Sequence, residues 1–503
     1  MNRIKVIALL GLGVLLVSCQ SLDTENLTNP DAERALSEPG DVESLIGSQF
    51  YVWMDNSYGS YPSWALSVAA DEGTGSWGNQ GMQVIGSEPR VAFPNTPAWS
   101  YNNVTETPWY GMYRALSSAN DGLVAVKDGM EFGTDGEDTK RAEVFARFVQ
   151  GLATGWLALQ FDQAFIYTED VDLNTEKLEL KPYTEVMNAA IKMLDDAAAG
   201  AAANAFTLPN NWINEQTINS QELARIAKSF SARFLASVAR TPEERAAVNW
   251  ADVLARINAG ITRDFGFQAD NTNWEDEYKE RLQNSGWIRA DYRTVGPADI
   301  SGGYQQWLAT PVDDRQPFDI TTPDQRVTGA TPASDGTDFY YRLPQDFRAD
   351  RGTYHFSRYG HKRYASIRQT QIGFVPLMTL TEMDLYKAEA HIRLNQPDAA
   401  ATLVNKTRVA RGKLPPVAAT GTAGADCVPR TTTGTCGDLM AALMYEKRIE
   451  AFAVASGGAF FDARGWGILV PGTQLHFPVP ARELETLGLL NYSFGGSGPF
   501  TAK

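Results

Sequence analysis

The sequence predicts a mainly α-helical protein that carries long irregular insertions. The helical body of the 503-residue chain is expected in residues 41–265 and 371–485, where several segments repeat apolar residues with the period of an α-helix. Two stretches, residues 56–108 and 264–375, lack that period and are rich in Gly, Pro, Asn, Asp and Thr. Because several helices come in pairs with alanine at close-contact positions, we expect tetratricopeptide-like helix pairs, or else a bundle of unrelated pairs.

The charge of the chain excludes one class of function. It has 60 Asp and Glu against 44 Lys and Arg, which gives a formal net charge of -16 and a pI near 4.8. Electrostatic binding to a phosphate backbone needs a basic face, so nucleic-acid binding is not expected. No apolar run after residue 18 approaches the ~20 residues that span a bilayer.

The N-terminus has the pattern of an export signal. Arg3 and Lys5 precede an apolar run from residue 6 to 17 that is too short to span a membrane. The run ends in Leu-Val-Ser-Cys at residues 16–19, which resembles the lipobox of bacterial lipoproteins. We therefore expect residues 1–18 to be a signal peptide, Cys19 to be lipidated, residues 19–40 to be a tether, and residues 41–503 to form one domain. A plain secreted protein is the alternative.

The helices of the first block follow in order from Asp41. On the first of them, Val42, Ile46 and Phe50 fall on one apolar stripe. Similar stripes mark the helices that follow: Trp109, Met112, Leu116 and Leu123; Phe145, Phe148, Leu152, Trp156 and Leu159; Met187, Ala190, Ile191 and Leu194; Leu223, Ile226, Ala227, Phe230 and Phe234. Asn249 is expected to cap a short helix that carries Val253, Leu254, Ile257 and Ile261.

The second helical block is expected from Pro376 to Gly412 and again from residue 438 to 456. Glu382 and Glu389 share the apolar stripe of its first helix and should be partly buried. A buried carboxylate needs a partner, and we expect one among three arginines: Arg408, Arg448 and Arg464. Seven residues along one helix separate the two carboxylates by roughly 10 Å, which favours structural ion pairs over a catalytic pair.

Cys427 and Cys436 lie in a Thr- and Gly-rich stretch from residue 418 to 437. An exported chain meets an oxidising compartment, so two cysteines this close together predict a local disulfide. A metal site would need more ligands, and no histidine lies within fifteen residues of either cysteine.

Several motifs, in order along the chain, resemble one protein family. They are Trp109-Tyr110-x-x-Tyr113 with Asn120; Glu143-x-x-x-Arg147-Phe148; Leu380-Thr-Glu382 with Leu385, Glu389 and Ala390; Glu446-Lys447-Arg448-Ile449-Glu450; Phe460-Phe461-Asp462 with Arg464 and Trp466; and Phe477-Pro478-Val479-Pro480 with Glu483. With the N-terminal lipobox, this series is similar to the SusD/RagB family of outer-membrane nutrient-binding lipoproteins. The chain departs from the family at residues 456–459, where Ser-Gly-Gly-Ala replaces the usual Glu-Gly-x-Arg.

The resemblance implies a SusD-like helical fold and a protein that captures a nutrient without chemistry. The nutrient would be an oligosaccharide or a peptide, and it would pass to a SusC-like TonB-dependent transporter of the outer membrane. The lipid anchor would hold the protein on the outer membrane, facing the cell exterior. No cofactor is implied.

Motifs of catalysis are lacking, so the chain is not expected to be an enzyme. It has no Gly-x-Ser-x-Gly elbow, no His-Glu-x-x-His, and no phosphate-binding or dinucleotide-binding loop. The four histidines, at positions 355, 361, 391 and 476, are dispersed and predict no metal site. Two alternatives stay open: a helical hydrolase or lyase that uses paired carboxylates on polysaccharide, and a helical-repeat scaffold lipoprotein of the envelope.

The large aromatic residues of the irregular stretches are the candidate ligand contacts. Rings on loops can stack on sugar C–H faces, while nearby polar groups fix orientation. The candidates are Trp77, Trp99 and Tyr101 in the first stretch and Trp287, Tyr304 and Trp307 in the second, with Asn102, Arg289 and Gln306 nearby as hydrogen-bonding groups. For each ring the alternative is that it anchors its loop to the helical body.

Overall fold

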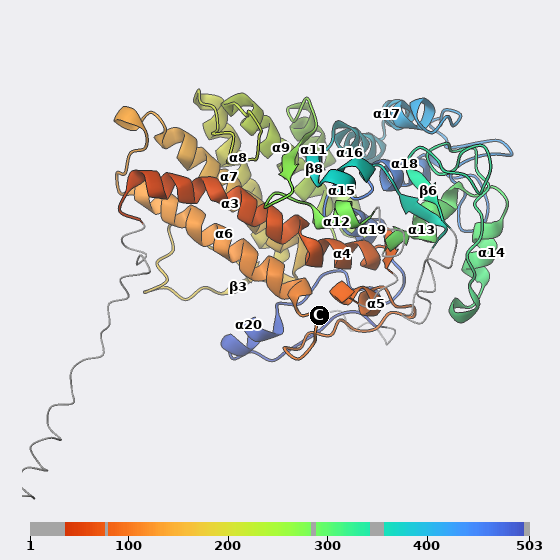
Figure 1. Ribbon diagram of the computed structural model, residues 1–503, viewed down its shortest axis with the longest axis horizontal. Helices are drawn as coiled ribbons and strands as arrows, with labels where there is room; N and C mark the ends of the chain where they lie inside the picture. The colour runs from red at the N-terminus through yellow and green to blue at the C-terminus, as the bar shows by residue number, and fades with distance from the viewer. Residues whose placement is uncertain (1–35, 76–78, 283–287, 343–356, 497–503) are drawn as a thin grey trace, which may run out of the picture.

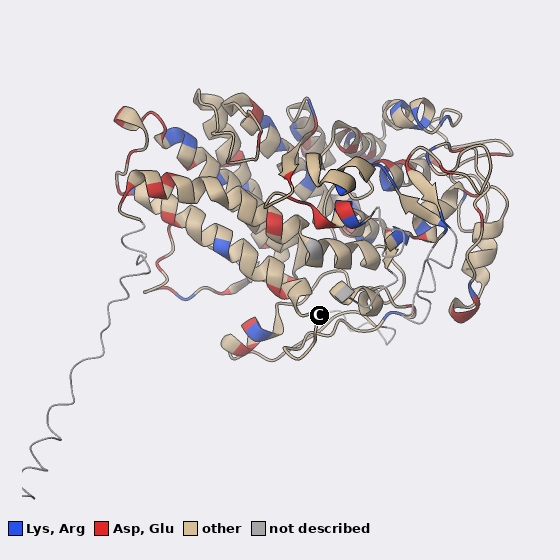
Figure 2. Ribbon diagram, in the orientation of Figure 1, with Lys and Arg blue, Asp and Glu red and all other residues tan. Residues whose placement is uncertain are grey.

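The computed structural model describes residues 36–75, 79–282, 288–342 and 357–496. Long helices form the left part of the molecule in Figure 1, and shorter helices, two-stranded sheets and loops form the right part. The predicted mainly α fold is confirmed. Figure 2 shows acidic and basic residues distributed over both parts. Within the described residues, no helix has the length and apolar character that crossing a membrane requires.

Five long helices make the left part. They are α3 (Pro39–Tyr58), α6 (Asn103–Lys127), α7 (Thr139–Gln160), α8 (Tyr183–Ala203) and α9 (Ser220–Ser237). Helix α7 lies at the centre and contacts the other four. Its predicted stripe residues Phe145, Phe148 and Leu152 are fully buried, so the periodicity located the core face of this helix correctly.

Two glycines allow α7 to approach its neighbours closely. A Cβ atom on Gly151 would lie 2.6 Å from Cγ of Leu194 on α8, and one on Gly155 would lie 2.1 Å from a ring carbon of Phe234 on α9. Both distances are far below van der Waals contact, so only glycine fits at these crossings. The small residues expected at helix contacts include glycine as well as alanine.

Two helix pairs follow the predicted pattern. Helix α9 packs on α11 (Trp250–Asn258), and α16 (Leu380–Arg393) packs on α17 (Pro397–Ala410). Asn249 caps α11 as expected, since its side chain accepts a hydrogen bond from the amide of Asp252 at 3.2 Å.

The expected start of the second helical block at Pro376 is wrong. Residues Ile372–Met378 form strand β8, which pairs antiparallel with β4 (Phe265–Asp270). Helix α16 begins only after Thr379, whose hydroxyl caps it by accepting from the amide of Glu382 at 3.1 Å. Proline lacks the amide hydrogen that a helix interior needs, and here it lies within a strand that has no third neighbour.

The first predicted irregular stretch contains more helix than expected. Helix α3 continues to Tyr58, and α4 (Ser60–Ala69) follows directly. Residues 62–70 are all buried, so no polar face reveals the helical period in the sequence. Between Ala70 and the start of α6, the described residues form β1 (Gly73–Gly75), a 3₁₀ turn (Asn79–Gly81) and α5 (Met82–Ile85), and are otherwise irregular.

The second irregular stretch is a series of short elements. They are α12 (Glu277–Arg281), β5 (Ile288–Ala290), α13 (Tyr292–Val295), α14 (Gly303–Ala309), β6 (Phe339–Tyr341), β7 (Tyr359–His361), α15 (Ala365–Thr370) and 3₁₀ turns at Gly296–Ala298 and Val312–Asp314. Its strands form two antiparallel pairs with short ladders, β1 with β5 and β6 with β7.

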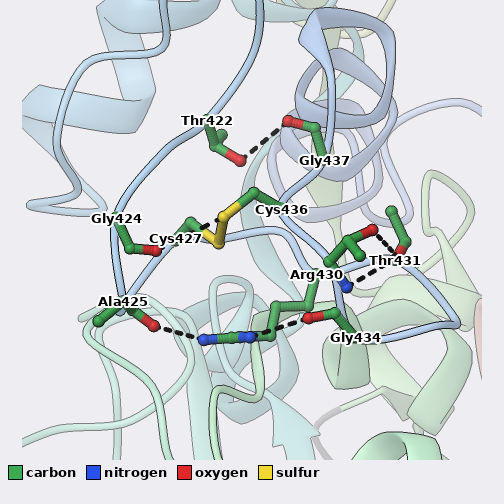
Figure 3. The surroundings of a disulfide bond; sticks show 10 residues. Thr422, Gly424, Ala425, Cys427, Arg430, Thr431, Gly434, Cys436 and Gly437 are labelled. Carbon is green, nitrogen blue, oxygen red and sulfur yellow. Dashed lines mark hydrogen bonds between the residues drawn. A yellow bond between two sulfur atoms is a disulfide. The ribbon is translucent and has the colours of Figure 1, made fainter.

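The remaining elements lie between or after these blocks. They are a 3₁₀ turn (Thr134–Gly136), the paired strands β2 (Gln163–Phe165) and β3 (Leu180–Pro182), and the helices α10 (Pro242–Ala247), α18 (Leu439–Glu450), α19 (Gly458–Trp466) and α20 (Ala481–Thr486). Cys427 and Cys436 are joined in a disulfide in the loop before α18, in agreement with the prediction (Figure 3).

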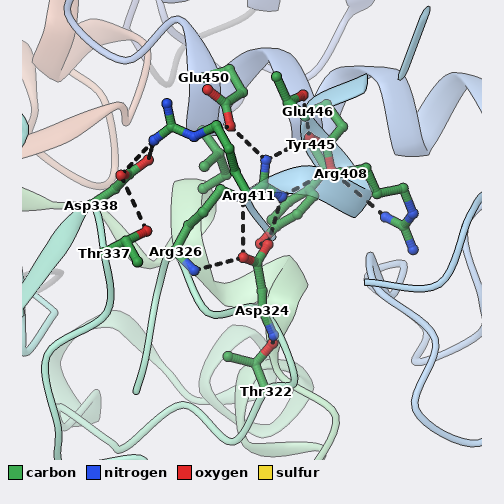
Figure 4. Close-up of polar contacts among 12 residues, drawn as sticks. Thr322, Asp324, Arg326, Thr337, Asp338, Arg408, Arg411, Tyr445, Glu446 and Glu450 are labelled. Atoms are coloured by element: carbon green, nitrogen blue, oxygen red, sulfur yellow. Dashed lines mark hydrogen bonds and ion pairs between the residues drawn. The ribbon is translucent and has the colours of Figure 1, made fainter. Parts of the chain in front are cut away.

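A cluster of charges is buried between the second irregular stretch and α18. Figure 4 shows Arg326 pointing toward three carboxylates. Its guanidinium lies 2.7 Å from Asp324, 2.6 Å from Glu446 and 2.9 Å from Glu450, and none of the four side chains is more than 3% exposed. We call these four residues the Arg326 cluster. It fixes the irregular stretch to the helical block through charge-assisted hydrogen bonds.

The C-terminal segment packs against the chain that precedes α6. The amide of Phe93 donates to the carbonyl of Phe494 at 2.9 Å. The side-chain amide of Asn95 donates to the carbonyls of Val479 and Tyr492 at 3.0 and 2.9 Å, and its oxygen accepts from the amide of Ala481 at 3.1 Å. Residues near both ends of the described chain therefore hold each other in place.

Candidate ligand-binding surface

Trp99 and Tyr101 are partly exposed rings on the turn that precedes α6. Trp99 packs edge-to-face on the buried Phe93 with centroids 5.2 Å apart, and on Tyr101 at 5.9 Å. The ring of Trp99 lies over Gly81, where a Cβ atom would come within 3.0 Å of it. Gly81 also has a positive φ of 71°, a conformation that favours glycine. The two rings are thus supported from below and retain solvent-facing surface.

Asn102 and Gln306 differ in how available they are to a ligand. The side-chain amide of Asn102 already donates to the carbonyl of Pro97 at 3.3 Å, which stabilises the turn that carries Trp99. Gln306 is exposed on the outer side of α14. Of this pair, only Gln306 presents its side chain mainly to solvent.

Tyr304 and Trp307 are buried in this structure. Each is 4% exposed, and their rings stack with centroids 6.3 Å apart. The guanidinium of Arg315 lies 4.4 Å from the centroid of Trp307, and Tyr292 packs on the same indole at 5.2 Å. The two rings anchor α14 to the molecule and present no open face to a ligand. Tyr304, Trp307 and Leu308 have helical spacing, a signal that the sequence already contained.

Arg289 is also an internal residue. Its side chain is fully buried, and Nη1 donates to the carbonyls of Ser357 at 3.1 Å and Arg342 at 3.3 Å. Arg289 therefore fastens strand β5 to the β6–β7 hairpin. Arg289 was expected to lie beside a ligand, but in the structure it makes this internal contact instead.

Trp77 and Trp287 lie outside the described residues. The strand ends next to them are described: Gly75, the last residue of β1, is the register partner of Ile288, the first residue of β5. The β6–β7 hairpin opens beside the same strands, because Arg289 of β5 reaches the carbonyls of Arg342 and Ser357. The described ends at Gly75, Ile288, Arg342 and Ser357 therefore lie in one region.

Glu382 and Glu389 form buried ion pairs, as predicted, but with other partners. Glu382 pairs with Arg233 of α9 at 2.5 Å, and Glu389 pairs with Arg245 of α10 at 2.6 Å. The three arginines that we expected have other roles: Arg408 lies 3.7 Å from Glu446, while Arg448 and Arg464 donate to backbone carbonyls.

The environment of Glu389 does not suit acid–base catalysis. Burial by itself would raise the pKa of this carboxyl, but the Arg245 guanidinium outweighs it and lowers the pKa to about 2. Arg245 also contacts Asp462 at 2.9 Å, and Lys447 lies 2.8 Å from the same carboxylate. These four charges neutralise one another inside the protein, which is a structural arrangement.

Among the buried carboxyls that the structure describes, Glu280 has the environment that most resembles that of a catalytic acid. Burial, reinforced by the negative charge of Glu275, raises its pKa to about 7. A pKa near neutrality is typical of catalytic acids, but the side chain is only 3% exposed and accepts a hydrogen bond from Gln371 at 3.2 Å. It is enclosed beneath the surface, where a polysaccharide cannot reach it.

The histidines do not form a metal centre in the described part of the chain. His361 is 1% exposed and stacks on Phe452 with centroids 4.7 Å apart, and His476 packs on Phe494. Burial lowers the pKa of both to about 3. His355 lies outside the described residues. Among those that are described, no group of three His, Cys, Asp or Glu has the geometry to hold a metal ion.

Comparison with known proteins places this architecture among solved structures. A SusD superfamily protein from Bacteroides vulgatus matches 90% of this chain and 97% of its own, with 16% identity and a TM-score of 0.56. A SusD superfamily protein from Bacteroides thetaiotaomicron matches 89% and 96%, with 14% identity and a TM-score of 0.56. Surface glycan-binding protein A from Bacteroides uniformis matches 90% and 99%, with 12% identity and a TM-score of 0.55.

Sequence comparison gives no such match: no family model matches the chain, and no curated protein does. The structural likeness at this level of identity concerns the fold. It confirms the fold that the motif series predicted, over about nine-tenths of the chain.

Proposed function

We propose that this chain, which has the SusD fold, captures an oligosaccharide at the cell surface and delivers it without chemical change to a membrane transporter. The observation that carries the proposal is the fold itself, shared along nearly the whole length of a surface glycan-binding protein from Bacteroides uniformis. A SusD-like carbohydrate binding protein from Bacteroides fragilis, with a TM-score of 0.54, supports the same reading. Fold alone does not define a ligand, so the site must supply the rest.

The site that we propose centres on Trp99 and Tyr101. Their rings are held at right angles to each other and remain partly exposed, which suits stacking against the C–H face of a sugar. Trp77 and Trp287 belong to the same proposal, because Gly75 and Ile288 beside them are paired. Tyr304 and Trp307 would act indirectly, by supporting α14. A peptide is the rival ligand, since aromatic surface also binds peptide side chains.

The proposed role is capture rather than catalysis. Glu382 and Glu389 are sequestered in ion pairs, and Glu280 is enclosed. A glycosidase needs two carboxyl groups about 5–10 Å apart on either side of an accessible bond. The described carboxyls with the most perturbed environments do not offer such a pair to a polymer, which favours capture over the hydrolase or lyase.

Lipid anchoring and a TonB-dependent, SusC-like partner complete the proposal. The Leu-Val-Ser-Cys ending at residues 16–19 supports lipidation of Cys19 and a place on the outer membrane. A Cys19→Ala variant should leave the membrane fraction or stay unprocessed. Affinity purification from native membranes should recover a large outer-membrane protein, and its absence would count against the partner.

The central experiment is calorimetric titration of residues 20–503 against a panel of oligosaccharides and peptides. Variants Trp99→Ala, Tyr101→Ala, Trp77→Ala and Trp287→Ala test the site. Phe374→Ala is the matched control, since Phe374 is a 39% exposed ring on β8. Loss of glycan affinity in the Trp99 and Tyr101 variants, but not in the control, is the expected result.

Three outcomes contradict the proposal. Unchanged affinity in all four site variants would refute the site. Selective binding of peptides would replace glycan by peptide as the ligand. Accumulation of cleaved products would replace capture by hydrolysis.

A further inference from the structure

Tyr340 lies on the outward face of the β6–β7 hairpin. In the antiparallel ladder, Phe339 opposes His361 and Tyr340 opposes Gly360. Phe339 and His361 are buried and both pack on Phe452, at 5.8 and 4.7 Å between centroids. Because successive side chains of a strand point to opposite faces, Tyr340 is on the other face, and it is partly exposed.

Two cations flank the Tyr340 ring. The guanidinium carbon of Arg342 lies 4.4 Å from the ring centroid, and Nζ of Lys362 lies 5.3 Å from it. Arg342 is two residues further along the chain from Tyr340 and therefore belongs to the same face. We call Tyr340, Arg342 and Lys362 the Tyr340 platform.

The platform's cations are weakly neutralised. The described carboxylate nearest to Lys362 is that of Asp335 at 4.0 Å, and no described carboxylate pairs with Arg342, which donates to the carbonyl of Tyr341 at 2.8 Å. Other cations of the hairpin differ: Arg358 lies 2.8 Å from Asp319, and Arg363 has a carboxylate partner at 2.6 Å.

This local charge is opposite to that of the whole protein. Residues 335–371 contain seven Lys and Arg against four Asp, whereas the chain has a net charge of -16. Two cations that lack strong partners, on a protein that is otherwise acidic, make the platform a local attractor for anions. Beside them, a Cβ atom on Gly360 would meet no described atom within 4 Å, although Gly360 itself is covered.

We infer that the Tyr340 platform binds a sugar residue that carries a negative charge, as a carboxylate or a sulfate ester. This inference rests on the proposed capture function and specifies its ligand as an anionic glycan. The exposed part of the Tyr340 ring would receive the sugar, while Arg342 and Lys362 would donate charge-assisted hydrogen bonds to the acidic group. Such bonds are stronger than a partly exposed cation–π contact, so an anion can recruit both cations from the ring.

The hairpin that carries the platform is fastened to strand β5. Arg289 of β5 donates to the carbonyls of Arg342 and Ser357, which flank the hairpin. The first residue of β5, Ile288, is paired with Gly75. The hairpin that carries the platform is therefore joined, through β5, to strand β1.

The test is titration of residues 20–503 with four probes: an oligogalacturonate, a sulfated oligosaccharide, a neutral xylo-oligosaccharide and a polyglutamate peptide. The variants are Arg342→Gln, Lys362→Gln and the double variant, with Tyr340→Phe to retain the ring. Lys192→Gln is the matched control, because Lys192 is an exposed lysine on α8 whose side chain is 75% accessible. Thermal melting confirms that each variant is folded.

We expect one of the anionic glycans to bind at least about tenfold more tightly than the neutral one. The double variant should lose that difference, while Lys192→Gln and Tyr340→Phe keep it. The two anionic arms tell carboxylate from sulfate.

Three results overturn the inference. Tight binding of the neutral glycan, unchanged in the double variant, refutes the anionic ligand but leaves glycan capture intact. Binding of polyglutamate alone shows an unspecific anion site. Binding of no glycan, here and in the wider panel, refutes the proposed function together with the inference.

Discussion

In the left part of the molecule, α3, α7 and α8 bury no charged side chain, whereas in the right part α16, α18 and α19 bury many of theirs. The left part is held by rings such as Phe230, which packs on Trp53 at 5.6 Å and on Phe148 at 6.0 Å. The right part is held by the Arg326 cluster and the pairs around Arg245. A packed apolar cluster can adjust to a changed side chain, whereas a buried charge destabilises the protein when any of its partners is removed.

The largest expected effect comes from breaking the Arg326 cluster. Arg326→Met leaves Asp324, Glu446 and Glu450 buried together without their cation. We expect the free energy of unfolding to fall by about 3–5 kcal/mol, as for other broken buried pairs. Urea denaturation measures this loss, and Arg263→Met, at a pair whose arginine is 56% exposed, serves as control. Equal effects of the two changes would remove the distinction between buried and exposed pairs.

The disulfide loop adds a second test in the right part. Replacing both Cys427 and Cys436 by Ser opens a loop with a sequence separation of 9. Loss of this loop closure should lower stability by about 2–3 kcal/mol. The parent protein under reducing conditions should show the same loss. A double variant as stable as the parent would show that the hydrogen bonds around Arg430 and Thr431 suffice to hold the loop.

A ring substitution in the left part should cost less than loss of Arg326. Phe230→Leu keeps an apolar side chain in a cluster that can adjust around it. We expect a loss of about 1–2 kcal/mol. The loss should be the same at pH 5 and pH 8, since no titrating group contacts the change directly except Arg233, which stays charged throughout. A loss as large as that of Arg326→Met would contradict the contrast between the two parts.

The last expected effect has the opposite sign and is a gain of stability at Glu280. Its pKa is about 7 in the folded protein, against 4.5 for an ordinary glutamate. A raised pKa gives stability that is complete below pH 4.5 and is lost as the pH rises through 7. Glu280→Gln should therefore stabilise the protein at pH 8 by up to about 3 kcal/mol, with no gain at pH 4.5. Urea midpoints at both pH values measure this, and an identical shift at both would contradict it.

The sequence predicted the left part well because apolar stripes are local. Val42, Ile46 and Phe50 are three residues of one helix, and their spacing alone shows which face is buried. Helix α4 was missed for the opposite reason: both of its faces are buried, so no alternation with polar residues exists to be seen.

A local sequence pattern could not show which arginines pair with the buried carboxylates of the right part. The sequence showed that Glu382 and Glu389 need cations, but Arg233 and Arg245 lie 149 and 144 residues away. A clue was available for Arg233, since it lies beside Phe230 and Phe234 on a face that is otherwise apolar. The helical spacing of Tyr304 and Trp307 likewise indicated a packed helix rather than a ligand contact.

From the sequence, the candidate ligand residues could be predicted only by their residue type and by their place in an irregular stretch. Trp99 and Tyr101 keep solvent-facing surface because the turn before α6 carries them at the edge of the core. Their exposure depends on which distant residues cover them, just as the burial of Trp307 depends on Arg315 and Tyr292. The Tyr340 platform was missed because Lys362, which directly follows strand β7, is distant along the chain, and only the pairing of β6 with β7 brings it near the ring.

The bonds between Asn95 and the C-terminal segment set an order of events for biogenesis. The turn that carries Trp99 is closed by Val479, Tyr492 and Phe494, and Val479 and Tyr492 lie 384 and 397 residues along the chain from Asn95. A nascent chain that has been synthesised only as far as α9 still lacks the residues that support these rings. The shape of this turn therefore depends on segments at opposite ends of a long stretch of chain, and a variant that lacks residues 479–494 should keep α3 to α9 but lose the support for these rings.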